Sequence, residues 1–248
     1  MPGSDIFNAL IANMNAEKTG FVEDLLLREY GAVFAATSVK PPTAIVFEDE
    51  EAVAEFQSSV SARTAMIGEY EFTLQTAAMN SLLDAVTEAA GAGLTISGRG
   101  PDSALRSYAE TVGLWASRVE PALDHWTREG RISPEEADVI RRLAPFGQVS
   151  KVLELENNGL FFAKDLSKSI IYSVAPPGAS QHLSMLAFDV KEFDAEDVRV
   201  TLAKHRWFQT VTSDLPHFTY LGVAESELAG LGLKRVEHAG RPFWVPDI

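Results

Sequence analysis

Two histidines and two aspartates stand close together in the last third of the chain, in two short stretches that hold no other ionisable side chain. His182 and Asp189 belong to Ser-Gln-His-Leu-Ser-Met-Leu-Ala-Phe-Asp, and Asp214 and His217 belong to Asp-Leu-Pro-His. Two imidazoles and one carboxylate form a ligand set suited to a catalytic zinc that keeps its fourth position for water. The second carboxylate, Asp214, precedes His217 by three residues, where it could take a proton from that water. The residue types and their spacing therefore indicate the site of a metal-dependent hydrolase.

These side chains can share one metal only if the chain folds back between them. His182 and Asp189 are separated by about 23 Å in an extended chain and by about 10.5 Å in a helix. Donor atoms on one zinc lie within about 4 Å of each other, given bonds near 2 Å. We therefore expect a turn at His182, prepared by the Pro-Pro-Gly at 176–178, and a strand at Asp189. The proline between Asp214 and His217 likewise predicts a turn.

Each of these spacings alone arises often by chance, and its residues would then be ordinary solvated or buried polar groups. The other histidines, His125, His205 and His238, show no comparable pattern and are interpreted in that ordinary way. The case for a metal site therefore rests on the combination of the two stretches.

The composition limits the classes of function. The chain has 248 residues, a net charge of -14 and no cysteine. The acidic balance argues against a nucleic-acid partner, and the absence of cysteine excludes disulfides and thiolate zinc ligands. No apolar run is long enough to span a bilayer, so no transmembrane segment is predicted. The N-terminus shows no signal-peptide pattern, and we expect an extracytoplasmic (periplasmic or secreted) protein whose signal peptide lies outside this sequence, with a cytoplasmic location left open.

Short strands that follow a helical start predict an α+β fold, with an antiparallel sheet flanked by helices. Residues 1–70 are interpreted as a mainly helical N-terminal extension, and residues 71–248 as the domain that carries the site. The apolar periodicity and the capping residues predict the following elements: helices over 20–37, 48–66, 72–90, 194–205 and 226–231, one capped by Asp102 or Ser103 and one beginning at Ser133; strands over 44–47, 94–97, 183–190, 208–211 and 218–221; and a hairpin that pairs 233–236 with 243–245.

Three segments together resemble the zinc D-alanyl-D-alanine carboxypeptidase family of the VanX/VanY type, which shares a core fold with the hedgehog signalling domain. The family pattern is S-x-H-x-x-G-x-A-x-D followed by E-x-x-H, after an upstream arginine in an R-S-Y-like segment. Here the first motif is residues 180–189, introduced by an Ala-Pro-Pro-Gly, and the second is residues 214–217. The upstream segment is Arg106-Ser-Tyr. Order and separation match over roughly residues 72–248, so the resemblance implies a hedgehog-like fold and a D-Ala-D-Ala peptidase-like catalytic domain over 71–248.

The resemblance also implies a role for each matched residue. His182, Asp189 and His217 would be the zinc ligands, Asp214 would be the catalytic base, and Arg106 would hold the substrate. A peptide that ends in D-Ala carries a carboxylate, for which arginine offers a planar pair of donors. We expect Arg106 in the first turn of its helix, where the helix dipole favours an anion, with Arg99 as a weaker rival. Ser180 would bind substrate or support the turn.

Two positions depart from the family pattern. Met185 stands where the pattern has glycine, so its side chain either fills substrate space or adopts a backbone angle that glycine takes more easily. Asp214 stands where the pattern has glutamate, and its side chain is one methylene shorter. The backbone must then approach the water more closely for Asp214 to act as the base.

The sequence therefore predicts a zinc metallopeptidase that hydrolyses peptidoglycan stem peptides or other D-Ala-terminated peptides, most simply a D,D-carboxypeptidase that releases terminal D-Ala. Two alternatives stay open. One is a peptidoglycan endopeptidase of the L-Ala-D-Glu type, which would need a more open groove. The other is a metal-holding binding module without turnover, against which the acid at position 214 argues.

Overall fold

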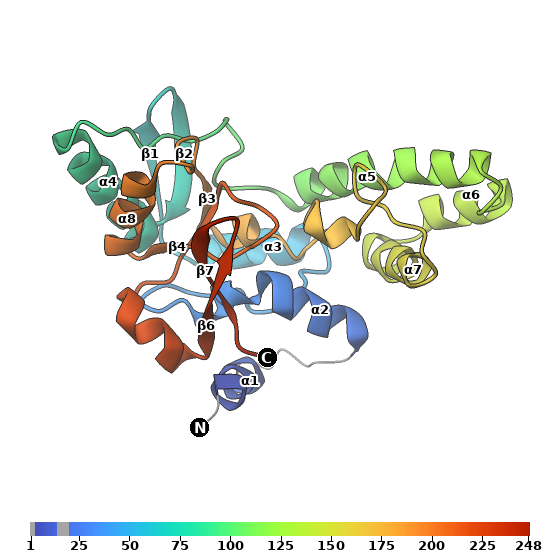
Figure 1. Ribbon diagram of the computed structural model, residues 1–248, viewed down its shortest axis with the longest axis horizontal. Helices are drawn as coiled ribbons and strands as arrows, with labels where there is room; N and C mark the ends of the chain where they lie inside the picture. The colour runs from blue at the N-terminus through green and yellow to red at the C-terminus, as the bar shows by residue number, and fades with distance from the viewer. Residues whose placement is uncertain (1–2, 14–19) are drawn as a thin grey trace.

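A three-stranded antiparallel sheet carries two of the candidate ligands. The structure, a computed structural model, describes residues 3–13 and 20–248 and has an α+β fold, as the sequence predicts. The strand order is β3 (Ala187–Asp189), β5 (His217–Tyr220), β4 (Trp207–Gln209). Helix α8 (Glu196–Lys204) packs against β4, and α4 (Thr76–Gly91) packs against α8 (Figure 1). Buried aromatic rings fill the space between these elements, and this apolar core fixes the strands in place.

Two hairpins flank this sheet. The predicted C-terminal hairpin is confirmed: β6 (Leu233–His238) pairs with β7 (Arg241–Pro246), and Ala239 and Gly240 both have positive φ at the turn. The other hairpin, β1 (Ala62–Ile67) with β2 (Tyr70–Gln75), was not predicted. The helices predicted over 48–66 and 72–90 are wrong at residues 59–66 and 72–75. Helix α3 (Glu50–Ser58) ends before the first of these segments, and α4 begins only after the second, at Thr76. Gly68, at φ 65°, allows the two-residue turn that joins the strands.

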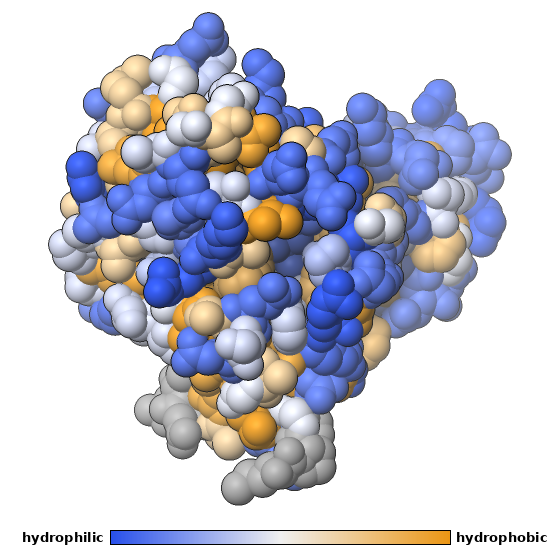
Figure 2. Space-filling view, turned by 60° about the vertical axis from the view of Figure 1, so that its left-hand side comes forward, coloured by the Kyte–Doolittle hydropathy of each residue, from blue (hydrophilic) through white to orange (hydrophobic). Residues whose placement is uncertain are grey.

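Three helices form an arm to one side of the sheets (Figure 1). They are α5 (Tyr108–Arg128), α6 (Pro134–Arg142) and α7 (Pro145–Asn157), and they enclose a second apolar core. Ser133 caps α6 as predicted, with its side chain accepting a hydrogen bond from the Glu136 N–H. Figure 2 shows that hydrophilic residues cover most of the visible surface of the arm.

The start of α5 differs from the prediction. Neither Asp102 nor Ser103 caps the helix; Ser107 does, in a capping box with Glu110. Arg106 therefore lies just before the N-cap and not in the first helical turn. The buried face of the helix consists of Tyr108, Thr111, Trp115, Val119, Ala122 and Leu123.

The N-terminal elements pack against the rest of the chain. They are α1 (Gly3–Asn13), α2 (Phe21–Tyr30) and the 3-10 helix η1 (Gly31–Ala35). Phe7 and Ile11 of α1 are buried in the same core as Phe188 and Trp207. The boundary that we predicted at residue 70 falls on the first residue of β2, within the hairpin that β1 and β2 form. Residues 1–2 and 14–19 of the predicted extension lie outside the described residues.

The remaining elements are short 3-10 helices: η2 (Ile170–Tyr172), η3 (Gln181–Ser184) and η4 (Glu225–Leu231). The strand predicted over 183–190 is therefore a 3-10 turn followed by a short strand. The segments 44–47 and 94–97 form no strand, although nearby Gly98 pairs with Val190 in an isolated bridge. Within the described part of the chain, every helix is too short or too polar to cross a membrane.

Candidate metal centre

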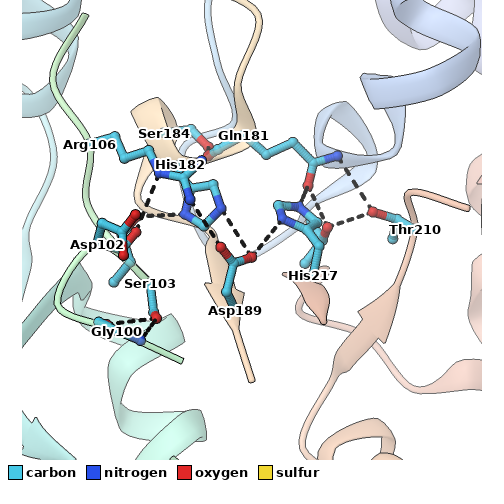
Figure 3. Close-up of polar contacts among 12 residues, drawn as sticks. Gly100, Asp102, Ser103, Arg106, Gln181, His182, Ser184, Asp189, Thr210 and His217 are labelled. Carbon is cyan, nitrogen blue, oxygen red and sulfur yellow. Dashed lines mark hydrogen bonds and ion pairs between the residues drawn. The ribbon is translucent and has the colours of Figure 1, made fainter. Parts of the chain in front are cut away.

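The fold brings His182, Asp189 and His217 together, as the sequence predicts. His182 lies on η3, Asp189 ends β3, and His217 begins β5. Asp189 and His217 are direct partners in the antiparallel register, so the sheet itself places them side by side. One ligand atom from each of the three residues lies within 4.8 Å of the others (Figure 3).

The predicted turn before His182 is also present. Gly178 has φ 79°, and the Ala179 N–H donates to the Pro176 carbonyl at 3.0 Å. A Cβ at position 178 would lie 2.0 Å from the Phe47 carbonyl oxygen, so only glycine fits. The chain then enters η3, which places His182 next to Asp189 at the end of β3.

The environment of His182 fixes which ring nitrogen is free. Its Nδ1 lies 2.7 Å from the Ala104 carbonyl oxygen, to which it can only donate, so Nε2 keeps a lone pair. Nε2 faces the Asp189 Oδ1 at 3.3 Å. The residue is 2% exposed, and this burial lowers the pKa of the imidazole despite the opposing effect of Asp189. A neutral ring with a directed lone pair is the form that binds a metal.

His217 is oriented in the same way by Gln181. The His217 Nε2 lies 2.9 Å from the Gln181 Oε1, and its Nδ1 faces the Asp189 Oδ1 at 3.2 Å. The amide of Gln181 cannot turn over, because its Nε2 donates to the Tyr30 carbonyl at 2.8 Å. The Thr219 hydroxyl donates to the same Oε1. His217 must therefore donate from Nε2 and present Nδ1 to the centre.

Asp189 is held as a carboxylate between the two rings. Burial alone would raise the pKa of its carboxyl, but the electrostatic influence of the adjacent His182 and His217 outweighs this effect and holds the pKa well below its ordinary value. Its second oxygen, Oδ2, accepts from Arg106 Nη2 at 3.0 Å. One oxygen thus faces the two imidazoles and the other is occupied by Arg106, an arrangement that leaves Oδ1 as the ligand atom (Figure 3).

The donor set fits a zinc-type ion. Two nitrogens with directed lone pairs and one carboxylate oxygen converge from three separate elements, and each has a partner on its far side. The distances of 3.2 and 3.3 Å from Oδ1 to the two nitrogens match the donor separations of a tetrahedral centre with bonds near 2 Å. The three residues could therefore hold a metal ion with a coordination position left for another ligand.

A cavity of about 480 Å³ opens onto these residues, within the range of small-ligand sites. Asp214, Arg106 and Ser180, predicted to act on the substrate, all line it, and so does Arg99. The predicted turn at Asp214 is present, with its carbonyl accepting from the His217 N–H at 3.1 Å. The Asp214 side chain is exposed and its carboxylate makes no hydrogen bond within the described residues, so it is free to act on a molecule in the cavity.

Met185 adopts the backbone angle that the family's glycine suggests. Its φ is 56° and its ψ is 34°, which is the left-handed region. The side chain is 2% exposed and is not among the residues that line the cavity, so it does not fill substrate space. The substitution therefore affects the turn and the core more than the site.

Sequence reasoning missed Gln181, Thr210 and Thr219, which together orient His217. Thr210 and Thr219 lie on and beside neighbouring strands with their hydroxyls 2.6 Å apart, and Thr219 points to the same face of β5 as His217. The period-two alternation of β5 was the available signal, since two residues along a strand share a face. The contact between Gln181 and His217 joins distant parts of the chain and had no local signal.

No protein-family model matches the chain, and comparisons with curated proteins and with solved structures find no significant similarity. The resemblance to the D-alanyl-D-alanine peptidases consequently rests on the motifs of the sequence.

Proposed function

We propose that the protein is a zinc metallopeptidase that acts on peptidoglycan stem peptides, as a D,D-carboxypeptidase that releases terminal D-Ala in an extracytoplasmic compartment. The observation that carries the proposal is that His182, Asp189 and His217 converge at the wall of a cavity that Asp214 also lines. Each of the three has a further hydrogen-bond partner that orients its side chain. A cluster with a purely structural role would not need an exposed carboxylate in the same cavity.

Zinc held by these three residues would lower the pKa of a coordinated water to about 7 and polarise the scissile carbonyl. The protein supplies the proton transfers. The Asp214 carboxylate takes a proton from water as the water oxygen bonds to the carbonyl carbon. It then gives that proton to the leaving amine as the C–N bond breaks, so the products are a shortened peptide acid and free D-Ala.

Arg106 supports this reaction in two ways. Its Nη2 holds the ligand carboxylate of Asp189, and its Nε donates to the Asp102 carbonyl at 3.3 Å. The remaining nitrogen, Nη1, has no hydrogen bond to any described residue and belongs to a side chain that lines the cavity. We assign Nη1 to the substrate, as a donor to the terminal carboxylate or to the carbonyl beside it.

Product analysis with a stem pentapeptide tests the proposal. The zinc-loaded protein should release one D-Ala from the free-acid pentapeptide and little from the C-terminally amidated one, as mass spectrometry of both products will show. Asp214→Ala should keep zinc and lose about 10² to 10⁴-fold in rate. Asp102→Ala, which removes another exposed carboxylate that lines the same cavity, is the matched control and should retain most activity.

Other outcomes point elsewhere. Equal cleavage of the free and amidated pentapeptides, or a cut inside the stem, would favour the endopeptidase. Tight zinc binding with no product from either peptide would leave a binding module.

A further inference from the structure

A third arginine, Arg118, lines the cavity besides Arg99 and Arg106. Arg118 lies on α5, one helical turn beyond Leu114, and both side chains line the cavity. Its guanidinium is partly buried; Nε donates to the Ser173 hydroxyl at 3.1 Å and Nη1 to the Ser117 hydroxyl at 2.9 Å. Within the described residues, no carboxylate forms an ion pair with it.

The missing partner is notable because the chain is rich in acids. It carries 35 aspartates and glutamates against 21 lysines and arginines, and the neighbouring Arg141 alone contacts three carboxylates. A half-buried guanidinium that is held in place by two hydroxyls and left without a counter-ion is suited to bind an anionic group from outside. None of the carboxylates that line the cavity pairs with Arg118 within the described residues: Asp189 pairs with Arg106, and Asp102 and Asp214 have no ion pair with Arg118.

The first part of α5 sets the distance between Arg106 and Arg118. Arg118 lies ten residues into α5 from Tyr108, a rise of about 15 Å along the helix axis, while Arg106 lies just before the start of the same helix. An extended peptide covers that distance with about four residues. Ser173, which holds Arg118, is joined to His182 by the short segment 174–181, part of which lines the cavity between them.

We propose that Arg118 binds a second carboxylate of the substrate, about three to four residues before the terminal carboxylate that Arg106 binds, and that the cavity selects acidic peptides. The proposal rests on the proposed carboxypeptidase function, which leaves only one residue on the C-terminal side of the cut. In a stem pentapeptide the γ-linked D-glutamate, three residues before the terminal D-Ala, offers a free α-carboxylate near this distance.

Two pentapeptides that differ at one group test this assignment: L-Ala-γ-D-Glu-L-Lys-D-Ala-D-Ala and the same peptide with the α-carboxylate of D-Glu converted to an amide. Binding is measured by calorimetry to zinc-loaded Asp214→Ala protein, so that neither peptide is consumed. The acid form should bind roughly ten-fold or more tightly than the amide form, the scale of one charge-assisted contact. Arg118→Met should remove this difference, and Arg118→Lys should keep part of it.

Arg128→Met is the matched control, because Arg128 is an exposed arginine near the end of the same helix and does not line this cavity. It should leave the difference between the peptides unchanged. In the protein with Asp214 intact, the difference should appear in KM, with kcat nearly equal for the two peptides.

Failure of this assignment is distinguishable from failure of the proposed function. Release of D-Ala from both peptides with equal KM would overturn the role of Arg118 and leave the hydrolase standing. Ten-fold discrimination in binding without any release of D-Ala would overturn the hydrolase and leave the Arg118 site. Discrimination that persists in Arg118→Met would also overturn the assignment.

Discussion

Gln181 offers the most direct test of how the metal centre is built. We expect Gln181→Leu to weaken metal binding although the residue is not a ligand. The leucine keeps the approximate length of the side chain and removes the Oε1 that accepts from His217 Nε2 at 2.9 Å. His217 is then free to change tautomer, which puts a proton on Nδ1, or to rotate its ring, which turns Nδ1 away from Asp189; either change removes the lone pair that faces the centre.

The size of the effect follows from the burial of His217. The residue is 5% exposed, so its Nε2–H loses its acceptor without gaining water. An unsatisfied buried donor costs about 1–3 kcal/mol. At 1.4 kcal/mol for each factor of ten, the metal Kd should rise about ten- to hundred-fold, which is also the usual effect of removing an outer partner of a metal-bound histidine.

The assay is zinc titration in competition with a chromophoric chelator, with the Co²⁺-loaded absorption spectrum as a second readout of the geometry. Thr219→Val is the matched control, because it removes the other donor to the same Oε1 and keeps the bond between Gln181 and His217. Its metal Kd should change several-fold less. If Gln181→Leu binds zinc as tightly as the parent protein and stays folded, the inference that Gln181 fixes the ligand nitrogen is refuted.

Four further outcomes are expected. His182→Ala should lose zinc in elemental analysis while its circular dichroism stays that of a folded chain, because the two apolar cores do not depend on the ion. Arg106→Lys should lower kcat/KM on free-acid pentapeptide roughly ten-fold or more, since it keeps the charge and removes the planar fork. Burial raises the pKa of Glu156 above its ordinary value, outweighing its hydrogen bonds, so the stability that this group contributes is greatest when it is protonated and is lost as pH rises through the raised pKa. The Tm of the parent minus that of Glu156→Gln should therefore fall as pH rises above the ordinary glutamate pKa of about 4.3. Met185→Gly should lower the free energy of unfolding by up to about 2 kcal/mol in denaturant titration, because the lost burial of the side chain exceeds the relief of a left-handed backbone angle.

The three residues of the candidate metal centre could be predicted because their signals are chemical and local. A histidine or an aspartate keeps its donor atoms whatever element carries it, and glycine and proline turns made it plausible that His182, Asp189 and His217 could meet. The C-terminal hairpin was predictable for a similar reason, since two short apolar runs flank a compact turn. The antiparallel register that pairs Asp189 with His217 was not visible in the sequence, but it agrees with the prediction that these residues share one ion.

The elements that were predicted wrongly depend on distant contacts. The predicted helices included residues 62–66 and 72–75, yet these residues form a hairpin whose Phe72 packs edge to face on Phe188, with ring centroids 5.1 Å apart. Packing against the sheet outweighs a difference in local propensity that is worth less than about 1 kcal/mol for each residue. The orienting role of Gln181 was missed for the same reason, because its partners come from α2, β5 and the end of β4.

Met185 shows how a departure from a motif should be weighed. Glycine at this position of the family pattern suggests a backbone requirement, and the structure has that requirement: the chain turns through the left-handed region, with the Met185 N–H donating to the His182 carbonyl at 3.2 Å. Methionine meets it at a cost of about 1–2 kcal/mol, and its buried side chain offsets this cost by about 1.5–3 kcal/mol. The mismatch is thus one of side-chain volume, on the side of the turn that faces the core. It leaves the geometry that delivers His182 to Asp189 intact, so it does not weaken the argument for a metal centre.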